Sequence, residues 1–309
     1  MLGGRRAMAG APVRWRGSAL GAQVSIEIYH PDRAKAERLI HLCVEDVRRL
    51  ERQFSLYDPN SAIRALNRTG VLAPPDTDMV ALLNAALDFA ALTDGAFDPT
   101  VQPLWDLYAA HFTHADPAPE GPAADRLAEA LSKVGYRHLK VSPDRIALLK
   151  PGSAITLNGI AQGYATDRVT ETLRDAGLST TLVDMGEIRA SGVKPDGAPW
   201  RVGLADPDEP GRINETIGLV DRAVATTAGA GFRFDSAGRF THLFDPRTGR
   251  SPSQYRSVSV IAPTATEADA LSTAFSLLPP PRIREIMATR SNIQVHLTDA
   301  NGKVLVHGA

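Results

Sequence analysis

Glu267–Thr273 (EADALST) carries a carboxylate and a hydroxyl at helical spacing. Asp269 and Thr273 are four residues apart, so on a helix they would share one face. Their oxygens are hard ligands of the kind that Mg²⁺ binds. Because acidic residues are also common in the first turn of a helix, an ordinary helix start is the alternative. If Asp269 binds a metal ion, we expect its side chain to be partly exposed.

A second segment, residues 155–167, runs from a β-like stretch into a helix through Asn158 and Gly159. The first turn of a helix has unpaired N–H groups, which can bind an anion. Gly159 and Gly163 allow a ligand or another backbone to approach closely. The alternative is an ordinary turn with Asn158 as the helix cap.

A third segment places His242, Asp245 and Arg247 within six residues, in a turn marked by Pro246 and Gly249. An imidazole can accept a proton near neutral pH, which would make His242 a candidate base. The turn can equally be structural, with Asp245 capping it and Arg247 pairing with that carboxylate.

A fourth segment, residues 94–100 (DGAFDPT), is expected to be a loop that enters a helix near Pro99. The ring of Phe97 could pack on a flat ligand or belong to the core. Asp98 could contact a ligand or cap the helix.

These segments must be positioned by an alternation of helices and short strands. Helices are expected at 32–54, 76–92, 159–176, 266–278 and 282–288, where apolar residues recur every three to four positions. Strands are expected at 23–29, 137–142, 154–158, 181–183, 202–204, 213–220, 224–227 and 257–261, with a terminal hairpin of 293–299 and 303–308. Residues 113–122 are expected to form a surface loop. Helices gathered early and strands gathered late indicate an α+β fold.

Composition narrows the classes of function. The chain has 309 residues and a net charge of −1 with interspersed signs, which argues against a nucleic-acid partner. No apolar run reaches the roughly 20 residues that a membrane span needs. Cys43 lies in an apolar helical series and is expected to be buried. The chain has no GxGxxG after a strand, no P-loop, no HExxH and no paired CxxC.

Residues 1–15 are expected to be a leader, disordered or the remnant of an export signal, and residues 16–309 a single domain. Arg5 and Arg6 hint at export, but no apolar region follows them. The two alternatives for this segment stay open.

Taken together and in this order, the four segments resemble the FAD:protein FMN transferase (ApbE) family. Ser55-Leu56-Tyr57, Asn60-Ser61 and Leu66-Asn67 add to the match, which spans about residues 16–308. The resemblance implies an ApbE-type α+β fold, with a mixed or antiparallel sheet core and packed helices. It implies transfer of the FMN part of FAD to a Thr or Ser hydroxyl of an acceptor flavoprotein, with Mg²⁺ as cofactor and AMP as product.

The family also suggests a context. Its acceptors are typically subunits of membrane redox complexes, so a periplasmic location or one on the outer face of the inner membrane is expected, while a cytoplasmic one stays open. Two other activities stay open: a metal-dependent FAD pyrophosphatase that forms FMN and AMP, and a non-catalytic FAD-binding carrier.

The resemblance also implies roles for individual residues. Asp269, Thr273 and the carbonyl of Gly159 would be metal ligands, and His242 the general base, with Asp269 also counted as catalytic. The expected FAD contacts are Tyr57, Ala96, Phe97, Asp98, Thr156, Gln162 and Leu243. The sequence departs from the family at several positions. Thr156 stands where many members have Asp, Gln162 where many have Lys or Glu, Leu20 and Ala22 where Met and Thr are usual, and residues 184–187 in place of a two-glycine segment.

Overall fold

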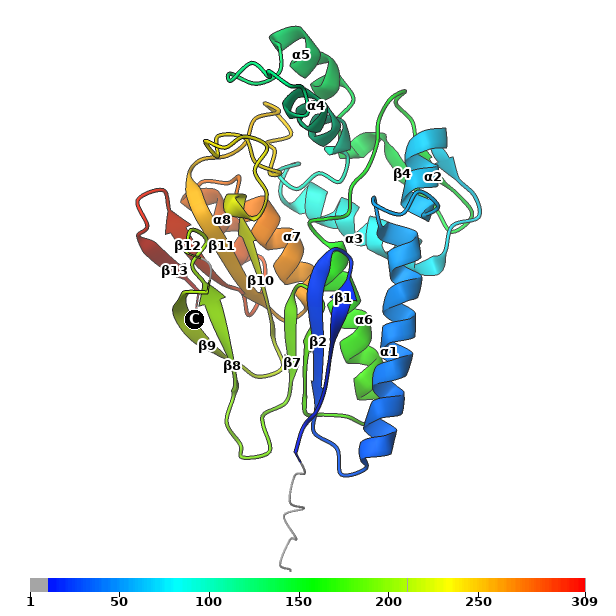
Figure 1. The fold of residues 1–309 in the computed structure, drawn as a ribbon, viewed down its shortest axis with the longest axis vertical. Helices are drawn as coiled ribbons and strands as arrows, with labels where there is room; N and C mark the ends of the chain where they lie inside the picture. The colour runs from blue at the N-terminus through cyan, green and yellow to red at the C-terminus, as the bar shows by residue number, and fades with distance from the viewer. Residues whose placement is uncertain (1–10, 210, 309) are drawn as a thin grey trace, which may run out of the picture.

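The computed structural model describes residues 11–209 and 211–308, and within them the fold is built on one large antiparallel sheet (Figure 1). In spatial order its eight strands are β1 (Val13–Ala19), β2 (Ala22–Ile28), β6 (Thr181–Asp184), β7 (Ile188–Ser191), β10 (Ala223–Ala228), β11 (Tyr255–Ala262), β12 (Gln294–Asp299) and β13 (Val304–His307). Two small sheets are formed by β3 (Val71–Leu72), β5 (Ile146–Leu148) and β4 (Leu139–Val141), and by β8 (Trp200–Ala205) and β9 (Ile213–Leu219).

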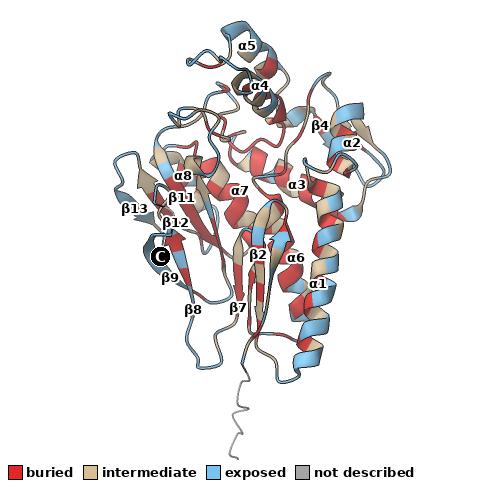
Figure 2. Ribbon diagram, viewed as in Figure 1, coloured by how far each residue is buried: buried red, intermediate tan, exposed pale blue. Residues whose placement is uncertain are grey.

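Helices pack against one face of this sheet and extend beyond one end of it. Their bounds are α1 (Arg33–Phe54), α2 (Ala62–Thr69), α3 (Thr77–Leu92), α4 (Gln102–Phe112), α5 (Ala124–Ser132), α6 (Ala161–Asp175), α7 (Ala265–Phe275) and α8 (Pro280–Ala288). Helices α6 and α7 pack on each other and on the sheet, and α1 packs outside α6. Figure 2 shows buried residues concentrated on α6, α7 and the strands that they cover. Helices α4 and α5 lie together at one end of the molecule (Figure 1).

Local sequence explains the long helix α1. The side chain of Asp32 caps it by accepting a hydrogen bond from the Lys35 N–H at 2.9 Å. Ile40, Cys43 and Val47 recur at helical spacing and are buried against the core, as the sequence predicts. The helix ends at Ser55, where the backbone becomes extended.

The α+β fold class is confirmed, and most expected helices and strands are present within a few residues of the predicted bounds. The strand predicted at 154–158 is wrong. This segment is extended but pairs with no strand. The Thr156 N–H donates a hydrogen bond to the Pro99 carbonyl, in a distant part of the sequence, at 2.8 Å. Helix α4 begins at Gln102 rather than near Pro99.

The N-terminal strand β1 was not predicted. It pairs with β2 in antiparallel register from Val13↔Ile28 to Ala19↔Ala22. The expected boundary of the leader at residue 15 therefore falls inside a paired strand, while residues 1–10 lie outside the described residues. Within the described ranges, no helix is both long and apolar enough to cross a membrane.

Candidate active site

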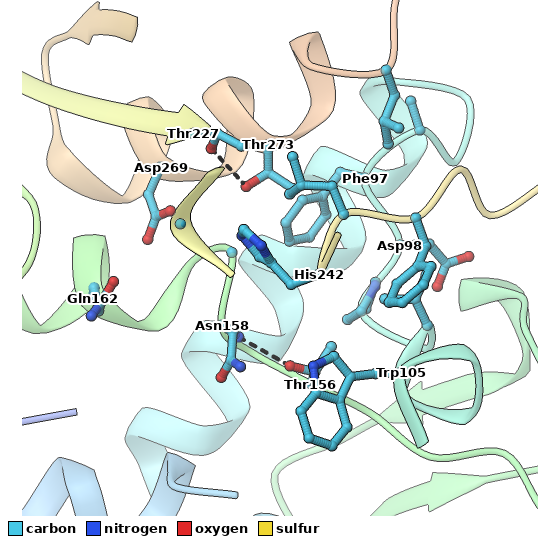
Figure 3. A pocket seen from close by; sticks show the side chains of 18 of the residues that line it. Phe97, Asp98, Trp105, Thr156, Asn158, Gln162, Thr227, His242, Asp269 and Thr273 are labelled. Atoms are coloured by element: carbon cyan, nitrogen blue, oxygen red, sulfur yellow. Dashed lines mark hydrogen bonds between the residues drawn. The ribbon is translucent and has the colours of Figure 1, made fainter. Parts of the chain in front are cut away.

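A cavity of about 290 Å³ lies where the four segments that carry the candidate functional residues meet. This volume is close to the lower end of the range for small-molecule pockets, about 300–1,000 Å³. Its lining includes Ala96, Phe97, Asp98, Thr156, Gly159, Gln162, His242, Leu243, Asp269 and Thr273, so all but one of the predicted site residues share it (Figure 3). The exception is Tyr57, which is 77% exposed and does not line the cavity.

The close contact of α6 with α7 brings the predicted metal ligands together. The Gly163 N–H donates to Asp269 Oδ2 at 3.0 Å. A Cβ at Gly163 would lie 2.4 Å from the Ala265 carbonyl oxygen and 2.8 Å from the Asp269 Cβ, so only glycine allows the helices to approach this far. A Cβ at Gly159 would lie 2.9 Å from Thr273 Oγ1, which places that turn directly against the second ligand.

Asp167 on α6 fixes the start of α7. Its carboxylate accepts hydrogen bonds from the N–H groups of Ala265 and Thr266, both at 2.8 Å, and from the Thr266 hydroxyl at 2.5 Å. Arg189 on β7 donates to the same carboxylate at 2.6 Å and compensates its charge. Because this network is buried, it sets the position of the helix that carries Asp269 and Thr273.

The floor of the cavity holds two buried carboxyl groups, Asp269 and Glu187, without a basic partner among the described residues. Asp269 is only 4% exposed; burial raises the pKa of its carboxyl, and the charge of Asp167 raises it further. Burial likewise raises the pKa of Glu187 well above its usual value, with Asp269 as the next cause. Among the described residues, neither Asp269 nor Glu187 forms an ion pair with Lys, Arg or His. The expectation that Asp269 is partly exposed is therefore wrong.

The oxygen groups in this floor fit a divalent cation. The Asp269 carboxyl, the Thr273 hydroxyl and the Gly159 turn offer hard oxygen ligands, and a cation would stabilise the ionised form of the buried carboxyl group. Thr227 on β10 holds the neighbouring hydroxyls, with Oγ–Oγ distances of 2.7 Å to Ser272 and 3.4 Å to Thr273 (Figure 3). The described residues contain no group of three or more His, Cys, Asp or Glu placed to hold a metal. Mg²⁺ commonly takes only one or two carboxylates and completes its shell with water and substrate phosphates.

His242 lies in the same cavity and is held by backbone. The carbonyl of Phe232 lies 3.2 Å from the His242 N–H and 3.3 Å from Nδ1. An Nδ1–H directed at this carbonyl leaves the lone pair on Nε2, the arrangement of a base. Burial lowers the pKa of His242, so the imidazole is neutral at pH 7. The neighbouring side chains of Asp245 and Arg247 form an ion pair at 2.9 Å. These two residues therefore have the structural role that the sequence left open for this turn.

The remaining predicted FAD contacts differ in their burial and in the hydrogen bonds that their side chains already form. Phe97 is buried and still lines the cavity, so it is both core and wall. Asp98 does not cap α4; its carboxylate accepts from the N–H and hydroxyl of Thr100 and from the Tyr136 N–H. Gln162 Nε2 lies 3.4 Å from the Leu20 carbonyl. Asn158 is not the cap of α6, because Ile160 occupies that position without a side-chain bond.

The residues that line the cavity and were not predicted include Trp105, Glu187 and Thr227. Glu187 lies in the segment 184–187 that departs from the family pattern, and this departure was the available signal. Trp105 and Thr227 lie on elements whose sequences carry no distinct motif. Their place in the site depends on tertiary packing alone.

Known proteins similar to this chain include FAD:protein FMN transferases. The model of the ApbE family matches residues 20–297. The FAD:protein FMN transferase of Escherichia coli K12 is 30% identical over 259 residues, which is 80% of this chain and 73% of the relative. The FAD:protein FMN transferase of Treponema pallidum is 32% identical over 284 residues, covering 84% and 76%.

Solved structures agree with these sequence relatives. The crystal structure of the ApbE protein from Thermotoga maritima superposes with a TM-score of 0.83 at 30% identity and covers 95% of this chain and 96% of its own. The flavin transferase ApbE from Vibrio cholerae gives 0.81 at 25% identity, with 96% of both chains covered. Since the family match spans nearly all of the described fold and the cavity gathers its motifs, this chain belongs to the ApbE family.

Proposed function

We propose that this chain is an Mg²⁺-dependent FAD:protein FMN transferase. It would move the FMN moiety of FAD to a Thr or Ser hydroxyl of an acceptor flavoprotein and release AMP. The observation that supports this most is that His242 lines one cavity with the oxygen ligands on α7 and in the turn before α6. The curated relatives above carry the same activity in their names.

The transfer needs a base beside the attacking hydroxyl. The hydroxyl oxygen forms a bond to the phosphorus of the FMN half, and the bond from that phosphorus to the bridging oxygen of AMP breaks. The hydroxyl proton passes to Nε2 of His242, which is neutral and held through Nδ1 by the Phe232 carbonyl. A base in this position contributes about 10²–10⁴-fold to the rate.

The other residues of the cavity would bind the substrate. A divalent cation held by Asp269, Thr273 and Gly159 would neutralise charge on the pyrophosphate oxygens. Helix α6 begins at the cavity without a side-chain cap, so the positive end of its dipole also favours phosphate. Phe97 and Trp105 supply flat apolar walls for a ring system.

A labelling assay tests the proposal. Purified protein is mixed with FAD, Mg²⁺ and a flavin-free protein domain that the Vibrio cholerae flavin transferase labels, and this acceptor domain is analysed on a denaturing gel. We expect a fluorescent acceptor that is heavier by the mass of FMN, and no label with EDTA. Steady formation of FMN and AMP without any label would instead identify a pyrophosphatase. Bound but intact FAD would identify a carrier.

The acceptor is a protein by the nature of this reaction. By family resemblance we propose a subunit of a membrane redox complex on the outer face of the inner membrane. Fractionation of cells that express the untagged chain tests the location, with recovery in the periplasmic fraction as the expected result.

A further inference from the structure

The segment that holds His242 also presents an exposed aromatic ring. Phe232 follows the 3₁₀ turn η2 (Gly229–Gly231) in extended conformation, and its carbonyl is the group that orients the imidazole. Its side chain is 47% exposed. The residue whose carbonyl fixes the base thus also carries a partly exposed apolar side chain.

This ring is continuous with the wall of the cavity. The Phe232 ring centroid lies 6.3 Å from that of Trp105, which lines the cavity, and 5.1 Å from that of Phe234 in an edge-to-face contact. Phe234 in turn packs on Tyr108 of α4 and on Phe244, which belong to one buried cluster. The ring of Phe232 is therefore supported from behind by packed aromatic side chains and is not an isolated exposed side chain.

Phe232 does not itself line the cavity. A flavin bound among Phe97, Trp105 and Gln162 would occupy the interior, whereas Phe232 lies outside it, with its ring against Trp105 and its carbonyl on the base. The group that must pass over this place is the acceptor, because its hydroxyl has to come within about 2.6–3.2 Å of Nε2 of His242. Residues that flank the hydroxyl lie about 3.3–3.6 Å further along the chain per position, so they reach the surface around His242.

Resting on the transferase function above, we infer that the exposed ring of Phe232, supported by Trp105 and Phe234, is the docking surface for the acceptor segment that carries the reactive Thr or Ser. Apolar side chains or the extended backbone beside that hydroxyl pack on the ring. The ring thereby places the hydroxyl at His242. The surface recognises protein and takes no part in holding FAD.

The test separates the affinity for the acceptor from the chemistry. Phe232→Ser is compared with wild type for KM of the acceptor domain, kcat at saturating acceptor, and Kd of FAD measured by flavin fluorescence. We expect KM for the acceptor to rise about tenfold, the usual size for truncation of an aromatic contact, by a larger factor than any change in kcat, while Kd for FAD stays the same. Phe232→Tyr keeps the ring and should restore KM. Leu149→Ser, an exposed apolar position that does not line the cavity, is the matched control.

Two results would overturn the inference while leaving the transferase intact: an unchanged KM for the acceptor in Phe232→Ser, or a weakened Kd for FAD that accounts for the loss. Thermal melting of each variant shows whether it is folded. If the wild-type protein binds FAD but labels no acceptor, the transferase proposal itself fails and the docking surface falls with it.

Discussion

Replacing Gly163 by Ala tests how closely α6 and α7 must approach. The added Cβ would lie 2.4 Å from the Ala265 carbonyl oxygen, whereas real Cβ contacts essentially never fall below 3.0 Å. The two helices must therefore separate by about 0.6 Å, or the backbone must deform by as much. Metal sites tolerate about ±0.2 Å in ligand distance. The displacement is about three times that tolerance, and it acts directly on Asp269, whose Cβ would be 2.8 Å away.

We expect Gly163→Ala to need at least about tenfold more Mg²⁺ for half-maximal transfer, and overpacking to lower the free energy of unfolding by about 1–3 kcal/mol. Mg²⁺ titration of acceptor labelling measures the first and urea unfolding the second. Glu171→Ala, an exposed position on the same helix, is the control and should change neither. A Gly163→Ala protein with the wild-type Mg²⁺ requirement would refute the idea that helix contact sets the metal site.

Three further substitutions probe the groups around the cavity. Asp269→Asn should abolish Mg²⁺-dependent transfer and the rise in Tm that Mg²⁺ causes. The Tm of the metal-free variant at pH 7 should stay the same or rise, because the raised pKa of Asp269 means that its ionisation destabilises the fold above the usual carboxyl pKa. A sharply lower metal-free Tm would contradict this. His242→Gln should slow transfer by about 10²–10⁴-fold with little change in Kd for FAD. In the wild type, the acid limb of the pH–rate profile should lie below pH 6.5, since burial lowers the pKa of His242 and the base is lost only as pH falls through that value; a limb at or above 6.5 would refute the assignment. Asp167→Asn keeps one acceptor oxygen, so it loses one of the two bonds to the N–H groups of α7 together with the charge toward Arg189. It should raise the Mg²⁺ requirement more than it lowers kcat at saturating Mg²⁺. Equal loss at all Mg²⁺ concentrations would make Asp167 purely structural.

Sequence periodicity predicted the elements that depend on local pattern. α1 is an example, because its cap and its buried stripe are both visible in the residues around Asp32 and Cys43. The segment 154–158 was misassigned because it is apolar and β-branched yet pairs with no strand. It is a short connection that brings Thr156 against Pro99, and pairing partners of this kind are set by the tertiary fold.

The site was predictable where residue types at fixed spacing carry the chemistry, as for Asp269 and Thr273. Burial could not be read in the same way. Asp269 resembles an early helix acid in sequence, and only the packing of α6 makes it buried and unpaired. Trp105 and Phe232 lie far apart in the chain, so nothing in the sequence indicates that their rings meet.

The most direct measurement of the central claim is a crystal structure of the protein with FAD and Mn²⁺, with the metal located by its anomalous scattering. We expect one strong peak bonded to the Asp269 carboxylate, the Thr273 hydroxyl and the Gly159 carbonyl, in contact with the pyrophosphate of FAD. A peak elsewhere, or FAD bound outside this cavity, would contradict the account.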